Sequence, residues 1–140
     1  MIEFISEDLE IPSFVDSSVA SWVEKVIQSH QCQAGDLTYL FCSDQHILQV
    51  NNQFLQHDYF TDIITFDYSS NKLIAGDLVI SLDTVKSNSE LFNTSFQEEL
   101  LRVIIHGVLH LIGFTDQTDD EKQEMRALEN KALSLFPTFR

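Results

Sequence analysis

The stretch that decides the fold of this chain lies at residues 103–116 and reads VIIHGVLHLIGFTD. Its apolar residues recur at the spacing of a helix with a buried body, and Gly113 is typical of a left-handed helix end. The side chains of His106 and His110 stand one turn apart on such a helix, so both imidazoles can reach one metal ion. Asp116 follows where a short return loop can bring a carboxylate to the same ion. The pattern therefore predicts a metal site.

Three protein ligands with a fourth position left for water are typical of a catalytic zinc site. The spacing H-x-x-x-H-x-x-G-x-x-D is also that of the metzincin peptidases, with an aspartate in the third place. That class has a glutamate directly after the first histidine as general base, and here the position is Gly107. Glycine costs a helix about 1 kcal/mol relative to alanine. Gly107 therefore indicates either close approach of another backbone or a substrate, or tight helix packing.

An aspartate as third ligand changes the charge at the metal. Two neutral imidazoles and one carboxylate leave a divalent ion with one formal positive charge, so a bound water should be less acidic than with three histidines. We expect zinc, and iron or manganese are alternatives. Asp119 and Asp120 are rival carboxylates, but their place at a helix start behind Thr118 explains them without a metal.

Three other charged residues are candidates for a functional role. Arg102 lies four residues before His106, roughly on the same side of the helix, and could hold a phosphate of the substrate by bidentate hydrogen bonds. The alternative, which we favour, is an ion pair with Glu98. Asp62 and Asp77 open two predicted strands, where functional groups are common, although a role as turn-forming residues explains both equally well.

The composition bounds the possible functions. The chain has 140 residues, and 8 basic against 22 acidic residues give a net charge of -14. This charge argues against broad attraction to nucleic acid or to an anionic membrane, so nucleic-acid chemistry would need a local basic or metal-assisted pocket. The N-terminal residues do not resemble a signal peptide, and no apolar run reaches the roughly 18 residues of a membrane span. We expect a cytoplasmic enzyme with Cys32 and Cys42 reduced.

Hydrophobic periodicity predicts one α+β domain over residues 1–140, with a mixed sheet of about four strands covered by helices and the metal-site helix in the C-terminal half. Strands are expected at residues 1–5, 37–42, 62–68 and 78–82. Helices are expected at residues 13–29, 44–55, 83–92 and 119–136. A further helix, which carries both histidines, is expected to begin after Thr94 or Ser95 and to end at about Ile112. The buried face of the last helix should consist of Met125, Leu128, Ala132, Leu133 and Leu135. Ser69, Ser70, Asn71 and Gly76 supply turn residues between the last two strands, so these should be antiparallel neighbours.

Three blocks of the chain resemble the YbeY endoribonuclease family. HGVLHLIGF at residues 106–114 resembles the family string H-G-x-L-H-L-x-G-[YF], which includes the glycine that peptidases lack. Residues 51–66, ending in TDIITF, resemble a second block that ends in T-D-V-L-S-F. GDLVIS at residues 76–81 is similar to the family's G-D-I-x-I-S strand. The blocks occur in the family's order and together span most of the chain.

The resemblance implies a single-domain, metal-dependent enzyme that cuts single-stranded RNA in 16S ribosomal RNA 3′-end maturation and ribosome quality control. Its substrate would be ribosomal RNA or the ribosome, reached through protein partners, with neither membrane nor DNA involved. The metal ligands would be His106, His110 and Asp116. Asp116 departs from the family, which usually has histidine there. Leu55 departs as well, because the family usually has an arginine at that place, and Arg102 is the candidate substitute.

Two other functions remain open from the sequence. A cytoplasmic zinc metallopeptidase would use the same ligand spacing, but Gly107 argues against it. A non-catalytic, metal-stabilised adaptor bound to the ribosome would account for Leu55 and for the strong acidity.

Overall fold

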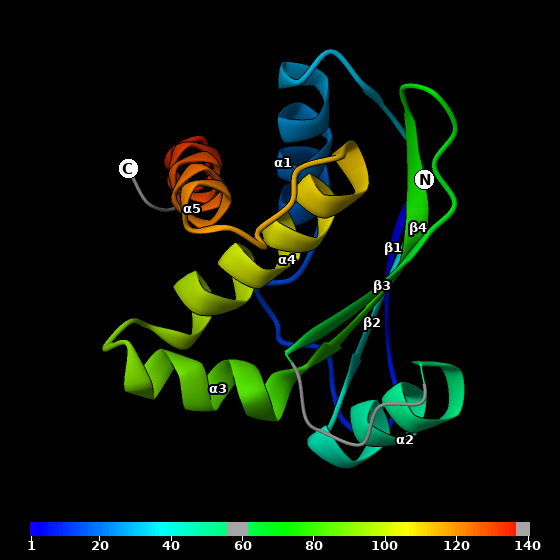
Figure 1. Cartoon of the computed structure of the whole chain (residues 1–140). Helices are drawn as coiled ribbons and strands as arrows, with labels where there is room; N and C mark the ends of the chain where they lie inside the picture. Colours follow the sequence, from blue (N-terminus) through cyan, green and yellow to red (C-terminus); the bar gives the residue numbers. More distant parts are fainter. Residues whose placement is uncertain (56–61, 137–140) are drawn as a thin grey trace.

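The computed structural model of the protein describes residues 1–55 and 62–136. These residues form a four-stranded mixed sheet and five helices (Figure 1). The strands are β1 (Ile2–Ser6), β2 (Gln33–Cys42), β3 (Ile63–Asp67) and β4 (Leu73–Ser81). The helices are α1 (Ser17–Ser29), α2 (Asp44–Leu55), α3 (Leu82–Leu91), α4 (Phe96–Ile112) and α5 (Asp119–Ser134). The predicted α+β class with a mixed sheet is confirmed.

The sheet has the strand order β1-β2-β4-β3. β1, β2 and β4 run parallel, whereas β3 runs antiparallel to β4, as the turn residues predict. The turn between them contains Asn71, whose φ of 56° is left-handed. The expectation that Gly76 belongs to this turn is wrong, because Gly76 lies inside β4. A Cβ there would collide with the carbonyl oxygen of Phe66 on β3, so the close approach of the two strands requires glycine.

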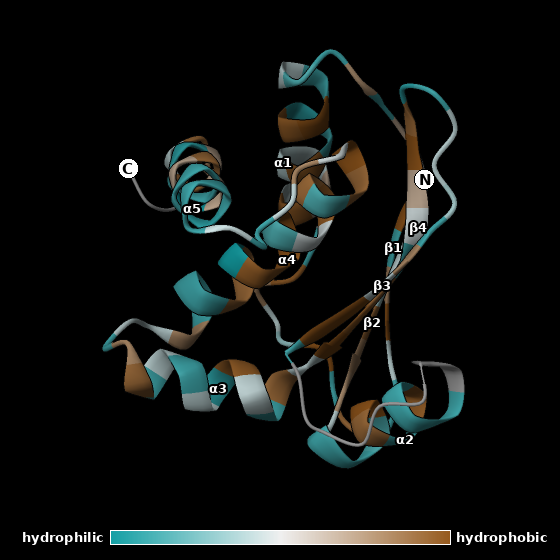
Figure 2. Cartoon of the chain, in the orientation of Figure 1, coloured by the Kyte–Doolittle hydropathy of each residue, from teal (hydrophilic) through white to brown (hydrophobic). Residues whose placement is uncertain are grey.

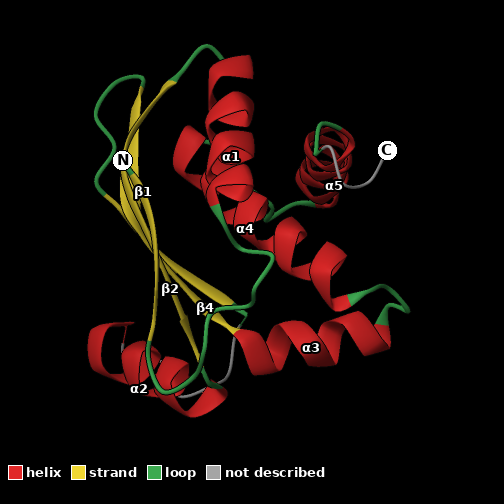
Figure 3. Cartoon of the chain, turned by 180° about the vertical axis from the view of Figure 1, so that it is seen from behind, coloured by secondary structure: helices red, strands yellow, loops and turns green. Residues whose placement is uncertain are grey.

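Helices cover the two faces of the sheet unequally (Figures 1 and 3). α1 and α4 pack on one face and α5 lies beyond them, away from the sheet, whereas α2 covers part of the opposite face. Alternate strand residues point into the core beneath α1 and α4, and they include Leu37, Tyr39, Phe41, Leu78 and Ile80. Figure 2 shows that much of α4, which packs on the sheet, is hydrophobic, whereas α5, which lies farther from the sheet, is mainly hydrophilic.

Capping residues set where the helices begin. The helix predicted over residues 13–29 begins at Ser17, because the side chain of Asp16 caps its first turn. Ser95 caps α4, and Thr118 forms a capping box with Glu121 at the helix start that the sequence indicates for α5. Local sequence therefore determines where the metal-site helix and the helix after it start.

Both cysteines are free thiols, as expected, and Cys42 is buried in β2. Burial, reinforced by nearby carboxylates, raises the pKa of the Cys42 thiol to about 12, which makes it unreactive. None of the helices in the described parts of the chain combines the length and the apolar character needed to cross a membrane.

Candidate metal centre

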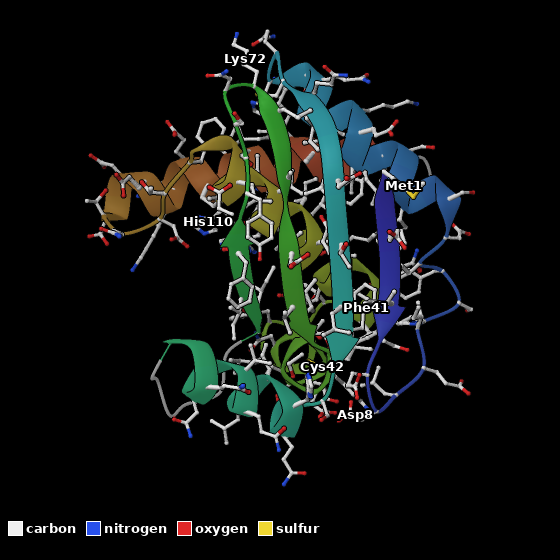
Figure 4. All side chains as sticks on the ribbon, turned by 90° about the vertical axis from the view of Figure 1, so that its right-hand side faces the viewer. Met1, Asp8, Phe41, Cys42, Lys72 and His110 are labelled. Carbon is white, nitrogen blue, oxygen red and sulfur yellow. The ribbon has the colours of Figure 1, made fainter. Side chains whose placement is uncertain are left out.

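α4 holds both histidines on one face, beside the β3 edge of the sheet, where Figure 4 labels His110. The rest of the helix is anchored by buried side chains, namely Leu100, Leu101, Val103, Ile104, Ile105, Val108, Leu109 and Leu111. His106 and His110 are only partly exposed, with 23% and 28% of their side chains accessible. The buried helix therefore fixes both imidazoles on one face, as the spacing predicts.

A tight loop after α4 returns Asp116 to the histidines. Gly113, with a φ of 126°, ends the helix and donates its N–H to the carbonyls of Leu109 and His110. The carboxylate oxygens of Asp116 lie 3.5 Å from His106 Nε2 and 3.6 Å from His110 Nε2. The two Nε2 atoms are 2.9 Å apart. A tetrahedral zinc ion with bonds of about 2.0–2.1 Å separates its ligands by roughly 3.4 Å, so these three donors could hold such an ion.

Hydrogen bonds on the far side of each ring use the Nδ1 atoms, so both Nε2 atoms can act as metal ligands. His110 Nδ1 donates to the Phe114 carbonyl at 3.0 Å, and His106 Nδ1 donates to the Glu129 carboxylate at 2.6 Å. Because both partners are acceptors and a neutral imidazole has one N–H, each Nε2 of a neutral ring carries a lone pair. Two lone pairs at 2.9 Å repel each other unless a proton or a cation compensates them. A hydrogen bond from the Nδ1 proton is the usual means by which proteins orient a histidine that binds a metal through Nε2.

Glu129 connects the centre to Arg102. Arg102 Nη1 donates to Glu129 Oε1 at 3.0 Å, and Nη2 donates to Asn130 Oδ1 at 2.9 Å. The paired side chains are 10% and 6% exposed. The expectation that Arg102 pairs with Glu98 is wrong, because α5 packs on α4 and offers a buried carboxylate that must have a charged partner. The expectation that Arg102 binds a phosphate stays a prediction.

The buried charges shift the pKa values of the centre. Burial alone would lower the pKa of His106, but the hydrogen bond to Glu129 and the charges of Glu129, Asp116 and Asp62 raise it above its usual value. Burial alone would raise the pKa of Glu129, but hydrogen bonds from His106 and Arg102 hold it below its usual range. A proton therefore competes with a metal ion for His106, and acid should weaken metal binding.

Asp62 lies at this centre, whereas Asp77 does not. A hollow of about 160 Å³ is lined by Asp62, Glu99, Arg102, Val103, His106, Arg126 and Glu129. Burial raises the pKa of Asp62, and the charge of His106 opposes the shift. Asp77 lies on the other face of the sheet, where it accepts a hydrogen bond from the Tyr68 hydroxyl at 3.3 Å. The fold thus separates two aspartates that the strand pattern left equivalent.

Tight packing explains Gly107. A Cβ at this position would lie 2.5 Å from Leu78 Cδ2 and 2.7 Å from Ile63 Cδ1, so α4 rests directly on β4 and β3 here. Of the two explanations left open by the sequence, helix packing is therefore sufficient. The glycine brings the histidine-bearing turn of α4 close to the sheet, which the bulkier glutamate of the peptidase motif would prevent.

We expect Gly107→Ala to lower the free energy of unfolding by about 1 kcal/mol. Overpacking costs typically 1–3 kcal/mol, roughly 1 kcal/mol of which is offset by the better helix propensity of alanine. Urea unfolding of both proteins measures the difference. Leu78→Val removes the Cδ2 methyl group that the added Cβ would meet. In the Leu78→Val protein, Gly107→Ala should therefore lower the free energy of unfolding by less. Stabilisation by alanine in the otherwise unchanged protein would contradict the packing explanation.

The sequence patterns missed Glu129, which belongs to the centre. It lies four residues after Met125 on the predicted buried face of α5, and a carboxylate on such a face needs a partner. Leu135 was expected on that face instead, but it is 37% exposed because the helix ends before it. Asp119 and Asp120 lie in the first turn of α5, as a helix start explains.

Residues 56–61, which belong to the second family block, lie outside the described residues. The side chain of Leu55, at the family's arginine position, lies outside them as well.

The fold and the centre define a small α+β protein whose two histidines and one carboxylate resemble the ligand set of a metal-dependent hydrolase. A family model described as "Endoribonuclease YbeY" matches residues 1–136, and the chain belongs to this family. A protein of Parabacteroides distasonis named endoribonuclease YbeY is 48% identical over 136 residues, which cover 97% of this chain and 96% of that protein. One of Phocaeicola vulgatus with the same name is 49% identical over 136 residues, covering 97% and 99%. The solution structure of a Thermotoga maritima protein superposes with a TM-score of 0.70 at 28% identity, covering 96% of this chain and 87% of that one.

Proposed function

We propose that the chain is a metal-dependent endoribonuclease that cuts single-stranded RNA, with residues 1–140 forming one hydrolase domain. The observation that carries the proposal is the pair of Nε2 atoms of His106 and His110, directed toward Asp116 by hydrogen bonds on the other side of each ring. Membership of the endoribonuclease YbeY family supports RNA as the substrate. As the family resemblance implies, the task would be 16S ribosomal RNA 3′-end maturation and ribosome quality control.

His106, His110 and Asp116 would hold one divalent ion, and we propose zinc. Two imidazoles and one carboxylate suit this ion and leave a position for water or substrate. When bound, it would polarise a phosphodiester oxygen and lower the pKa of a water molecule. The same donors accept iron or manganese, so the metal content belongs to the test.

The protein's own side chains orient the ligands and handle protons. Glu129 accepts the Nδ1 proton of His106 and so fixes the ring and its tautomer. Arg102 holds Glu129 in turn, and we propose that its main role is to position that carboxylate. Asp62 lies in the same hollow as His106, and burial raises its pKa, which makes the carboxylate a stronger base than an exposed one. We propose that Asp62 takes a proton from the attacking water or ribose hydroxyl.

The acidity of the chain bears on how RNA reaches the site. A net charge of -14 disfavours tight binding of RNA by the protein alone. We propose that the ribosome or a protein partner delivers the substrate, and that the enzyme therefore works in the cytoplasm. The peptidase alternative loses support, because the position of its general base is Gly107, packed against the sheet.

Removal of the metal should abolish RNA cleavage. Protein purified without added metal should contain about one zinc per chain by elemental analysis and should cut single-stranded RNA. Dialysis against a chelator should remove both the metal and the activity, and zinc should restore them. Casein serves as the control substrate and should stay intact throughout. Chelator-sensitive casein cleavage with intact RNA would favour the peptidase, and ribosome association without any cleavage would favour the adaptor.

A further inference from the structure

Basic residues gather at the metal centre of this acidic chain. Three of the eight lysines and arginines, namely Arg102, Lys122 and Arg126, line the two hollows that adjoin His106. Arg102 is buried in its pairs with Glu129 and Asn130, whereas Lys122 and Arg126 are exposed on α5. The same hollows also carry carboxylates, so the feature that suits an anionic substrate is the pair of exposed cations on α5 and not a net positive charge.

Lys122 and Arg126 lie one turn apart on the face of α5 that looks toward the centre. A hollow of about 170 Å³ is lined by His106, Asp116, Lys122, Met125, Arg126 and Glu129. It therefore runs from two of the candidate metal ligands to both basic side chains. Arg126 also lines the neighbouring hollow that contains Asp62, so its side chain borders both hollows.

Both basic side chains are available to a ligand. Arg126 has 58% of its side chain exposed and lies 4.0 Å from Glu129 Oε1, which already accepts the shorter hydrogen bond from Arg102. Within the described residues, no ion pair joins Lys122 to a carboxylate. The nearby carboxylate of Glu121 is occupied, because it accepts the N–H groups of Gln117 and Thr118. Exposed guanidinium and ammonium groups that no carboxylate holds closely are suited to bind phosphate.

We propose that Lys122 and Arg126 bind backbone phosphates of the RNA next to the phosphodiester that is cut. Four residues separate the two side chains by about 6 Å along α5, which suits contacts to neighbouring phosphates of one strand. These contacts carry no sequence information, so they position the strand across the centre without selecting bases. The inference rests on the proposed function and assigns the part of the same site that holds the strand.

The test compares Lys122→Ala/Arg126→Ala with Lys131→Ala, a control that removes a basic residue from the same helix at a different hollow. A short fluorescein-labelled 2′-O-methyl oligouridylate, which resists cleavage, is mixed with each zinc-loaded protein and gives the Kd by fluorescence anisotropy over a series of KCl concentrations. The double variant should bind about tenfold or more weakly. Its slope of log K against log salt should fall by about 0.7 for each lost phosphate contact. In cleavage assays with zinc, KM should rise more than kcat falls, and Lys131→Ala should match the unchanged protein.

An unchanged Kd and salt slope in the double variant, with the unchanged protein binding and cutting RNA, would overturn this inference and leave the proposed function intact. A fall in kcat at constant KM and Kd would overturn it as well, because binding of the strand would then be unaffected. If the unchanged protein with zinc neither bound nor cut RNA, the proposed function itself would fail. Circular dichroism of the variants confirms that both are folded.

Discussion

His110→Ala should abolish metal binding and reduce RNA cleavage about 1000-fold or more. The substitution removes one of three donors that lie within 4.8 Å of one another, so the remaining two cannot hold an ion in a catalytic arrangement. Loss of the metal removes several kcal/mol of charge stabilisation from the reaction, which corresponds to a rate loss of this size. Elemental analysis and kcat/KM on single-stranded RNA measure the two effects.

The fold should survive this substitution, because His110 is at the partly exposed edge of a helix that many other side chains anchor. His46→Ala on α2 is the matched control, since it removes an imidazole that is not among the three donors and lines neither hollow at the centre, so it should leave metal content and cleavage unchanged. Unchanged metal content together with unchanged cleavage in His110→Ala would show that the centre has been assigned to the wrong residues.

Glu129→Ala should lower the free energy of unfolding by about 3–5 kcal/mol. It leaves the Arg102 guanidinium buried without its ion-pair partner, which is among the more costly defects that a single substitution creates. Glu129→Gln keeps the size of the side chain and an oxygen that can accept from Arg102, so it should destabilise less. Either substitution removes the charged acceptor of His106 Nδ1, and metal affinity should fall about 10–100-fold.

Urea unfolding of the metal-free proteins and competition with a zinc chelator separate the two effects of Glu129. Glu124→Gln, an exposed position on the same helix, is the control and should change neither quantity appreciably. If Glu129→Gln kept the zinc affinity of the unchanged protein, the carboxylate would serve only to neutralise Arg102 and would not tune the histidine.

The features that the sequence predicts correctly are those encoded locally. The apolar repeat of α4 and the capping box at Thr118 involve residues within a few turns, and both appear where the pattern indicates. The spacing of His106, His110 and Asp116 is local too, because Gly113 reverses the chain within one short loop. These residues could therefore be grouped without knowing how the helices pack.

The features that the sequence analysis missed depend on contacts between distant elements. Arg102 pairs with Glu129 and not with Glu98 because α5 lies against α4, and a helix pattern does not contain this docking. Glycine is a typical turn residue, but Gly76 lies within β4, where the close approach of β3 leaves no room for a side chain. Asp62 reaches the centre only because β3 forms the edge of the sheet beside α4.

The position of α5 outside the helical layer has a consequence for the motions of the molecule. α5 packs on α4 and is also held near its C-terminal end by α1. There Trp22 Nε1 donates to the Ala132 carbonyl at 2.7 Å, and the Trp22 ring packs edge-on against the Phe136 ring. An outer helix of this kind can detach while the sheet stays folded, and such local opening costs less than global unfolding. Because α5 contributes Glu129, detachment would also release His106 from its acceptor. Occupancy of the centre and docking of α5 are then one linked equilibrium, and the amide hydrogens of α5 would exchange more slowly whenever the centre is filled.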